Sequence, residues 1–121
     1  MIKFSPLSPD ELPSCYSHDS SLNGYVGFDM NDDKICGYSV FRLNGYSMDI
    51  IDILSDADDE TVEGFIRSSL NYGANRGAYI AFYSAEKGRN VAISLGFSEN
   101  GNGIFEGEIP ELLAGHCCKN K

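Results

Sequence analysis

The segment from Tyr46 to Phe97 constrains the fold of this chain more than any other. It opens with an apolar run, Tyr46 to Leu54, and passes into a carboxylate-rich turn, Asp56 to Thr61. Apolar and small side chains then recur with the 3.6-residue period of a helix that buries one face. This pattern predicts an amphipathic helix from Thr61 to Arg76 whose buried stripe contains Val62, Phe65, Ile66, Ser69, Leu70 and Gly73.

A second apolar stretch turns this helix into a crossover connection. Gly77 is placed to end the helix, and Ala78 to Ser84 reads as another buried strand. Arg89 to Leu95 reads as a short helix closed by Gly96. Two buried strands joined by a helix of this length lie parallel, and their connection is right-handed.

The remaining segments predict antiparallel strands on either side of the crossover. Ser8 to Glu11 carries the residues of a capping box, so a short helix follows the first strand. Residues 18–21 and Asn23-Gly24 read as loop, and Asn44-Gly45 is a hairpin signal. The predicted strands are Ile2 to Phe4, Val26 to Met30, Ile35 to Arg42 and Ile104 to Ile109.

These elements predict one domain over residues 1–121 with a mixed α/β fold. The expected sheet has about six to seven strands, is twisted and mostly antiparallel, and has helices on both faces. Pro110 to Gly115 has room for one helical turn, and we expect residues 115–121 to form a flexible tail.

The charge of the chain excludes some classes of partner. Its net charge is -9 and its isoelectric point is about 4.4. Such a chain repels phosphate backbones and anionic membrane surfaces, so we expect no nucleic-acid or membrane partner. No apolar run approaches the length of about 18 residues that a membrane span requires.

The cysteines bear on the expected compartment. The N-terminal residues have no long apolar core of the kind found in a secretory signal. The four cysteines, Cys15, Cys36, Cys117 and Cys118, therefore read as thiols in a reducing cytoplasm rather than as a disulfide framework.

The order of elements, together with short motifs, resembles the GCN5-related N-acetyltransferase (GNAT) family. Ile2 to Leu12 is similar to the family's first strand and helix entry, Leu70 to Gly77 to the end of its cofactor-side helix, and Leu95-Gly96-Phe97 to its LGF corner. The resemblance implies a sheet with one parallel pair splayed at its centre. It also implies transfer of an acetyl group from acetyl-CoA to an amine.

The chain departs from the family pattern where the cofactor diphosphate would bind. Family members use a loop of the form (Q/R)xxGx(G/A), whose small residues let backbone amides approach the phosphates. The matching positions here are Asp58 to Val62, which hold three carboxylates and no glycine. A carboxylate about 4 Å from a phosphate charge costs about 4 kcal/mol at an effective dielectric constant of 20. That cost corresponds to about a thousandfold in affinity.

A second departure concerns the general acid. In the family a tyrosine four residues before the glycine of the LGF corner often protonates the leaving thiolate. That position is Ala92 in this chain. Tyr79 and Tyr83, on the neighbouring predicted strand, are the available substitutes if they face the cleft.

Asp49 and Asp52 lie inside the predicted central strand, on opposite faces. An unpaired carboxylate in such a strand has a raised pKa, which suits a general base. Asp52 shares its predicted face with Met48, Ile50 and Leu54, so we consider it as a catalytic base. The alternative is a structural carboxylate that accepts hydrogen bonds at the end of the strand or pairs with Arg42.

Two further groups are candidates for ion binding. Lys87, Gly88, Arg89 and Asn90 precede the short helix and form the best remaining phosphate site, although solvated charges at a helix start are the commoner explanation. The carboxylates Asp56 to Glu60 lack the spacing of a calcium loop and are better explained as helix-capping residues. His116-Cys117-Cys118 lacks the spacing of a zinc site, so we predict no metal.

Two functions remain open from the sequence. The first is an N-acetyltransferase that uses acetyl-CoA, with Asp52 as base, Tyr83 as acid and residues 87–90 holding the phosphates. The second is a relative that has lost acyl transfer and binds a small molecule or a protein, with dimerisation through an exposed sheet edge as one form of that binding. The mismatched diphosphate loop and general acid favour the second.

Overall fold

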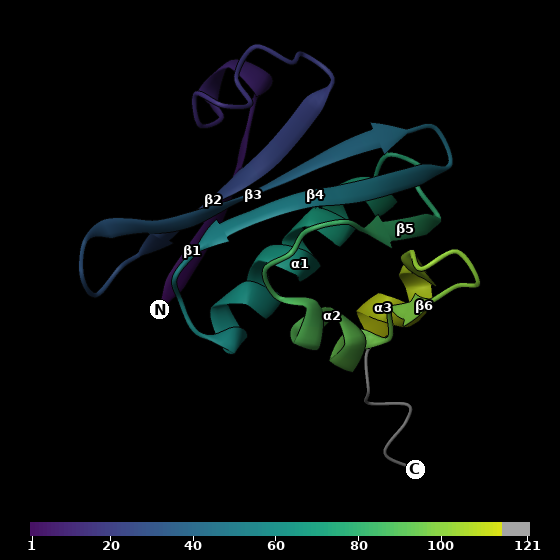
Figure 1. Ribbon diagram of the computed structural model, residues 1–121. Helices are drawn as coiled ribbons and strands as arrows, with labels where there is room; N and C mark the ends of the chain where they lie inside the picture. Colours follow the sequence, from purple (N-terminus) through teal and green to yellow (C-terminus); the bar gives the residue numbers. More distant parts are fainter. Residues whose placement is uncertain (115–121) are drawn as a thin grey trace.

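A computed structural model describes residues 1–114 and shows a twisted seven-stranded sheet packed against helices (Figure 1). The predicted tail, with His116, Cys117 and Cys118, lies outside the described residues. The strand order is β1-β2-β3-β4-β5-β7-β6. The strands are β1 (Ile2–Leu7), β2 (Leu22–Asp29), β3 (Lys34–Asn44), β4 (Ser47–Ser55), β5 (Ile80–Tyr83), β6 (Ser98–Glu99) and β7 (Phe105–Glu108).

The helical segments lie close to the positions that the sequence predicts. They are the 3₁₀ turn η1 (Pro9–Glu11) and the α-helices α1 (Asp59–Ala74), α2 (Arg89–Leu95) and α3 (Ile109–Ala114). The buried residues of α1 are the six predicted from its apolar stripe. The helix begins two residues earlier than predicted because Asp58 caps it, accepting a hydrogen bond from the Thr61 amide at 3.0 Å.

The predicted crossover is present at the centre of the sheet. β4 and β5 pair in parallel and α1 connects them, whereas the other strand pairs of residues 1–114 are antiparallel. The prediction of a mixed, mostly antiparallel α/β sheet is therefore confirmed. Two local predictions are wrong: Asn23-Gly24 belongs to β2 rather than to a loop, and the two-residue strand β6 was not foreseen.

Each face of the sheet has its own hydrophobic cluster. Residues of α1, α2 and α3 pack with the inward-facing side chains of β3, β4 and β5 in the larger cluster. The opposite face is covered by η1 and the loop after it, which bring Leu12 and Tyr16 against Leu22 and Val40. The region near η1 thus forms a lid over the side of the central strands that the α-helices leave open (Figure 1).

A bulge in β4 changes which side chains share a face. Val40 of β3 lies opposite Asp52 and Phe41 lies opposite Ile50, so Ile51 is an extra residue. Asp49 lies opposite Arg42, and Arg42 and Val40 are two residues apart on one face of β3. Asp49 and Asp52 therefore point to the same face, and the prediction that they point to opposite faces is wrong.

The main cluster contains one polar link between sheet and helix. Ser39 of β3 and Ser69 of α1 are both fully buried, and their hydroxyl oxygens lie 3.0 Å apart. The Ser69 hydroxyl donates to the Phe65 carbonyl at 2.8 Å, so the Ser39 hydroxyl is the donor between the two serines. Within residues 1–114, every buried side-chain nitrogen or oxygen has a hydrogen-bond partner, as stability requires.

We expect Ser69→Ala to lower the free energy of unfolding by about 1–3 kcal/mol, because the Ser39 hydroxyl would lose its acceptor in a dry environment. Ser39→Ala should cost less, since Ser69 keeps its bond to Phe65. In the double variant neither position has a hydroxyl, so no buried donor is left without an acceptor. The double variant should therefore be as stable as Ser69→Ala or more stable. Urea unfolding of the four proteins measures this coupling, and additive losses would contradict the assigned donor.

Candidate functional site

The central strands separate at one end of the sheet. β4 and β5 are paired only from Ser47 to Ile50, and beyond this pairing the Ser84 amide donates a backbone hydrogen bond to the Ile50 carbonyl at 2.8 Å. β4 continues to Ser55, so its last five residues have β3 on one edge and, among residues 1–114, no strand on the other. The bulge at Ile51 coincides with this separation, because the added twist turns β4 away from β5.

A groove of about 620 Å³ lies along the separated end of β4. Its walls come from the start of β3, the end of β4, Pro13 and Lys87. Most of the lining is apolar, and its charged members are Asp56 and Lys87. The lining residues are Pro13, Ile35, Cys36, Gly37, Tyr38, Ile53, Leu54, Ser55, Asp56 and Lys87.

Tyr83 fills the space between α1 and α2 next to this groove. It is 2 % exposed, and its hydroxyl donates to the Lys87 carbonyl at 2.5 Å. A Cβ added at Gly88 would lie 2.8 Å from that hydroxyl and 2.7 Å from Val62 Cγ1, which shows how closely the two helix starts approach. Burial raises the pKa of Tyr83, Asp52 adds to the increase and Arg89 opposes it.

The first turn of α1 is occupied by its own carboxylates. Asp58 accepts the Thr61 amide, and Asp59 accepts a hydrogen bond from the Asn90 side chain at 3.0 Å. The bond to Thr61 holds the pKa of Asp58 below its usual value. Asp59 and Glu60 are exposed. The acidic turn therefore serves as a helix cap and as a link to α2.

The four residues from Lys87 to Asn90 do not converge on one point. Asn90 is bonded to Asp59, and Arg89 donates to the Ala85 carbonyl at 3.4 Å while its guanidinium lies 5.6 Å from the Phe105 ring centroid. Gly88 begins α2 in a left-handed conformation with φ of 81°. Lys87 is exposed at the rim of the groove. Their role in binding phosphate stays a prediction.

Asp52 has a partner that the sequence did not indicate. The Tyr16 hydroxyl, 36 positions away in the chain, donates to Asp52 Oδ2 at 2.5 Å. This bond, with a contribution from burial, raises the pKa of Tyr16 to about 12. Asp49 accepts a hydrogen bond from the Ser84 hydroxyl at 2.7 Å. Both aspartates thus accept hydrogen bonds near the point where β4 and β5 separate.

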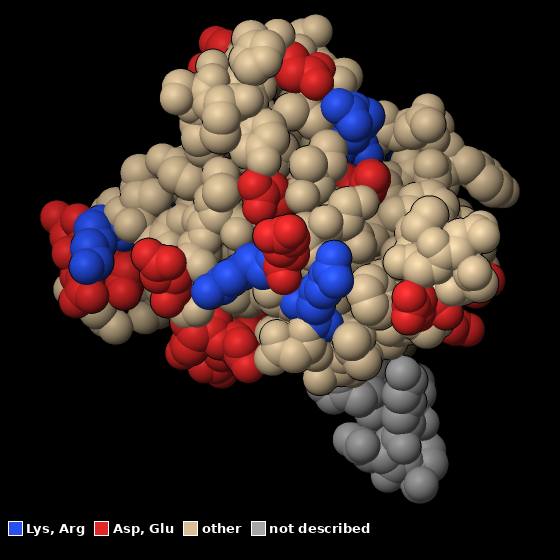
Figure 2. Space-filling view, in the orientation of Figure 1, with Lys and Arg blue, Asp and Glu red and all other residues tan. Residues whose placement is uncertain are grey.

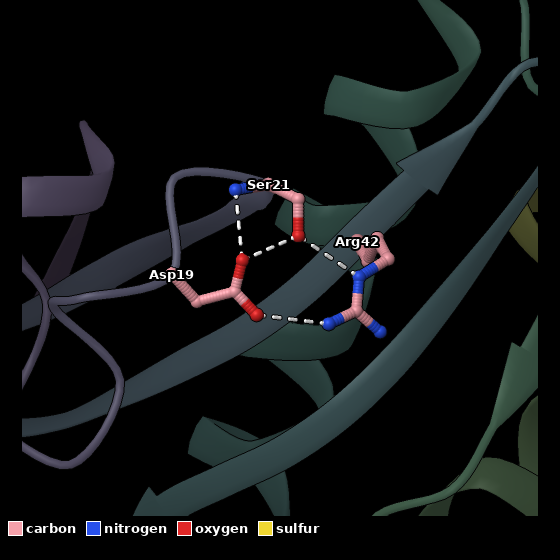
Figure 3. Close-up of polar contacts among 3 residues, drawn as sticks. All are labelled: Asp19, Ser21 and Arg42. Carbon is pink, nitrogen blue, oxygen red and sulfur yellow. Dashed lines mark hydrogen bonds and ion pairs between the residues drawn. The ribbon is translucent and has the colours of Figure 1, made fainter.

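Arg42, the ionic partner that the sequence offered for Asp52, pairs with Asp19 instead (Figure 3). The Arg42 guanidinium lies 3.1 Å from Asp19 Oδ2 and also donates to the Ser21 hydroxyl at 3.1 Å. Asp19 accepts the Ser21 amide and hydroxyl, which lowers the pKa of Asp19. The loop after η1 is therefore attached to the sheet at two places, by Tyr16 and by Asp19.

The contact between Tyr16 and Asp52 predicts a stability change in alkali. The pKa of Tyr16 is raised from about 10 in the unfolded chain to about 12 in the folded protein. The hydrogen bond from Tyr16 to Asp52 therefore stabilises the folded state fully below pH 10, and this stabilisation is lost as pH rises towards 12. The stability difference between the wild type and Tyr16→Phe should therefore shrink over this interval. Urea unfolding of both proteins at about pH 9, 10, 11 and 12 measures this difference in unfolding free energy. A difference that stays constant over the interval would contradict the prediction.

The position of the family's usual general acid is buried and carries no proton donor. Ala92 lies inside α2 and is 1 % exposed. Tyr79 is remote from the groove, since its hydroxyl donates to Glu108 of β7 at 3.2 Å. Tyr83 is nearer, but its hydroxyl is already directed at the Lys87 carbonyl. The use of Tyr83 as an acid stays a prediction.

Charged side chains are distributed unevenly around the groove. Figure 2 shows acidic side chains gathered at the tip of the β2–β3 hairpin and at the start of α1, with basic and acidic side chains mixed over the β5–α2 segment. The hairpin tip carries Asp29, Asp32 and Asp33, and the other acidic region comprises residues 56–60. Within residues 1–114, no three His, Cys, Asp or Glu side chains are arranged to hold a metal ion.

The arrangement of strands and helices matches solved structures. The chain superimposes on a protein from Desulfovibrio desulfuricans that is assigned to the GNAT family, with a TM-score of 0.68, 11 % identity and coverage of 90 % of this chain and 99 % of that one. The ribosomal-protein-S18-alanine N-acetyltransferase from Escherichia coli matches with a TM-score of 0.66, 15 % identity and coverage of 90 % and 94 %. The chain has the GNAT fold.

The likeness to these GNAT structures is one of fold. No sequence model of a known protein family matches the chain, and no curated protein matches its sequence. Likewise, none of the helices in residues 1–114 is long and apolar enough to cross a membrane.

Proposed function

We propose that this GNAT-fold chain is a binding domain for a small molecule or another protein and does not hold acetyl-CoA in the manner usual for the family. The observation that carries the proposal is the occupation of the α1–α2 junction by the chain's own groups. Asp58 and Asp59 accept hydrogen bonds at the start of α1. The Tyr83 hydroxyl and Val62 Cγ1 leave no room for a side chain at Gly88.

Electrostatics supports this reading. A diphosphate seated on the first amides of α1 would approach Asp59 and Glu60, and Asp59 is tied in place by Asn90. Like charges about 4 Å apart repel by about 1 kcal/mol in bulk water and by about 4 kcal/mol near a protein surface. The bond to Asn90 makes it harder for the Asp59 carboxylate to swing away. The helix dipole there is already compensated by carboxylates.

The chemistry of the leaving group gives independent support. A departing thiolate needs a proton donor within hydrogen-bond reach. Ala92 has none, and Tyr83 directs its proton to a backbone carbonyl while burial raises its pKa. A tyrosine held in this way is a poor acid at neutral pH, because its pKa lies far above the ambient pH.

One observation favours the alternative, an acyltransferase that moves acetyl from acetyl-CoA to an amine at a non-standard site. Asp52 and Tyr16 form a half-buried hydrogen-bonded pair close to the separation of β4 and β5. In that alternative Asp52 would attract and deprotonate the amine. Acetyl-CoA is the cofactor only if this alternative is correct.

A titration with acetyl-CoA decides between these functions. A ligand present at a hundred times its dissociation constant stabilises the folded state by about 2.7 kcal/mol. We expect no change in Tm at millimolar acetyl-CoA, with a well-characterised GNAT acetyltransferase as positive control. A concentration-dependent rise in Tm, together with release of free CoA when amines are added, would refute the binding-domain proposal and support the enzyme.

A further inference from the structure

We propose that a hollow between the end of α1 and the corner from β1 to η1 binds a small aromatic carboxylate. The hollow has a volume of about 420 Å³, within the range of about 300–1,000 Å³ that is usual for small-ligand pockets. It lies at the opposite end of α1 from the groove beside β4, so a ligand there is independent of the proposed function. Its walls come from the corner (Pro6, Leu7 and Pro9), from β2 (Asn23) and from the end of α1 (Tyr72 and Arg76).

The Arg76 side chain is held at this hollow by two contacts with one residue. Its guanidinium carbon lies 3.5 Å from the centroid of the Tyr72 ring, and its Nη1 donates to the Tyr72 carbonyl at 3.3 Å. That carbonyl is one of the last four of α1, which have no partner inside the helix. A guanidinium fixed in this way before a ligand arrives loses less conformational entropy on binding.

One edge of the Arg76 guanidinium remains available to a ligand. Among residues 1–114, its Nε and Nη2 make no hydrogen bond and no carboxylate pairs with it, whereas Arg42 and Arg67 each pair with one. Two N–H groups on one edge of a guanidinium match the two oxygens of a carboxylate. In a chain of net charge -9, a fixed arginine without an acidic partner in the described residues indicates a place for an external carboxylate.

Asn23 adds a second donor to the wall of the hollow. Its side-chain oxygen accepts a hydrogen bond from the Tyr72 hydroxyl at 3.2 Å. The NH2 group of the same amide therefore remains as a donor, and it has no partner among the described residues. Tyr72 thus positions both polar groups of the site, the amide through its hydroxyl and the guanidinium through its ring and its carbonyl.

The other walls favour a ligand with a flat apolar part. Pro6 is exposed, and Leu7, Pro9 and Tyr72 are half-buried, so their carbon atoms are open to a ligand. An aromatic ring covers such a surface and has few rotatable bonds to immobilise, which lowers the entropic cost of binding.

The charges near the hollow favour a ligand with a single negative charge. Arg76 is the one cation in the lining, and Asp10 and Glu11 follow directly after Pro9. Glu11 is held on η1 because it accepts hydrogen bonds from the Ser8 amide and hydroxyl. The two carboxylates repel any anion, and they repel a phosphate dianion twice as strongly as a monoanion. A carboxylate ligand combines the single charge with the planar shape that the guanidinium edge fits.

The test is an NMR titration of the full chain at neutral pH with benzoate as the probe. We expect saturable binding with a Kd of order millimolar, and shifts of the Arg76 Nε–H and the Asn23 side-chain NH2 signals that follow the same Kd. Benzamide has the same shape without the charge, and inorganic phosphate has the charge without the ring. Each should bind at least about tenfold more weakly than benzoate.

Variants of the protein separate the guanidinium edge from charge alone. Arg76→Gln should weaken benzoate binding at least about tenfold, and Arg76→Lys, which keeps the charge but loses the edge, at least about threefold. Asn23→Asp keeps an acceptor for the Tyr72 hydroxyl but replaces the donor by a negative charge, so it should also weaken binding at least about tenfold. Lys34→Gln, an exposed change at the start of β3, alters the net charge as Arg76→Gln does and should have no effect.

The Tm of each variant without ligand shows whether it is folded. If Arg76→Gln does not fold, Arg76→Lys and the comparison of benzoate with benzamide on the wild type decide. Three results would overturn the inference: no saturable binding of benzoate, equal binding of benzamide, or an equal loss of affinity in Lys34→Gln and Arg76→Gln. Phosphate binding as tight as that of benzoate would mean a general anion site and would reject the aromatic carboxylate.

Discussion

Replacing Asp59 and Glu60 together by glycine is expected to give this chain measurable affinity for acetyl-CoA. Both carboxylates are exposed on the first turn of α1, where a GNAT diphosphate would be held by backbone amides. Removing them eliminates a repulsion of about 1–4 kcal/mol for each carboxylate, which corresponds to about fivefold to a thousandfold in affinity. Calorimetric titration of the wild type and the variant with acetyl-CoA measures the gain.

A matched variant separates charge from shape. In Asp59→Asn/Glu60→Gln the side chains keep their size but lose their charge, so this protein should recover the electrostatic part of the gain only. Glycine in a first helical turn costs about 1 kcal/mol of stability, so Tm without ligand must be measured for each variant. If neither variant binds more tightly than the wild type, the carboxylates are not what excludes the cofactor, and Tyr83 becomes the main obstacle.

The sequence predicted the crossover because its signal is local. The stripe from Val62 to Gly73 repeats every 3.6 residues, and each of its members is buried against the sheet. Gly96 caps α2 and Gly77 lies in the turn that follows α1, and both have the positive φ angles that favour glycine. The parallel pair then follows from the length of the connection.

The geometry of the site was less predictable, because it depends on contacts between distant residues. The bond between Tyr16 and Asp52 joins residues 36 positions apart, and neither residue carries a local signal for the other. The bulge at Ile51 does have a signal in the sequence. Asp49 and Asp52 are three residues apart in an otherwise apolar strand, and two polar side chains at an odd spacing share a face only if the strand gains a residue.

Tyr83→Ala is expected to lower the free energy of unfolding by about 3–5 kcal/mol, the range found when large buried aromatic side chains are truncated. The ring is 2 % exposed and lies 5.5 Å from the Phe97 ring centroid, and its far end reaches Val62 and Gly88. Tyr83→Phe keeps this packing and loses only the bond to the Lys87 carbonyl. It should cost about 1 kcal/mol. Urea unfolding of the three proteins separates the two contributions.

The same pair of variants tests whether Tyr83 closes the cleft between α1 and α2. Tyr83→Ala leaves a space lined by apolar atoms of Val62 and Phe97, and apolar cavities of this kind bind small apolar molecules. Benzene should therefore raise the Tm of Tyr83→Ala and leave that of Tyr83→Phe unchanged. If Tyr83→Ala is destabilised but benzene has no effect, the helices have collapsed into the space. Tyr83 would then hold α1 and α2 apart rather than fill a cleft that exists without it.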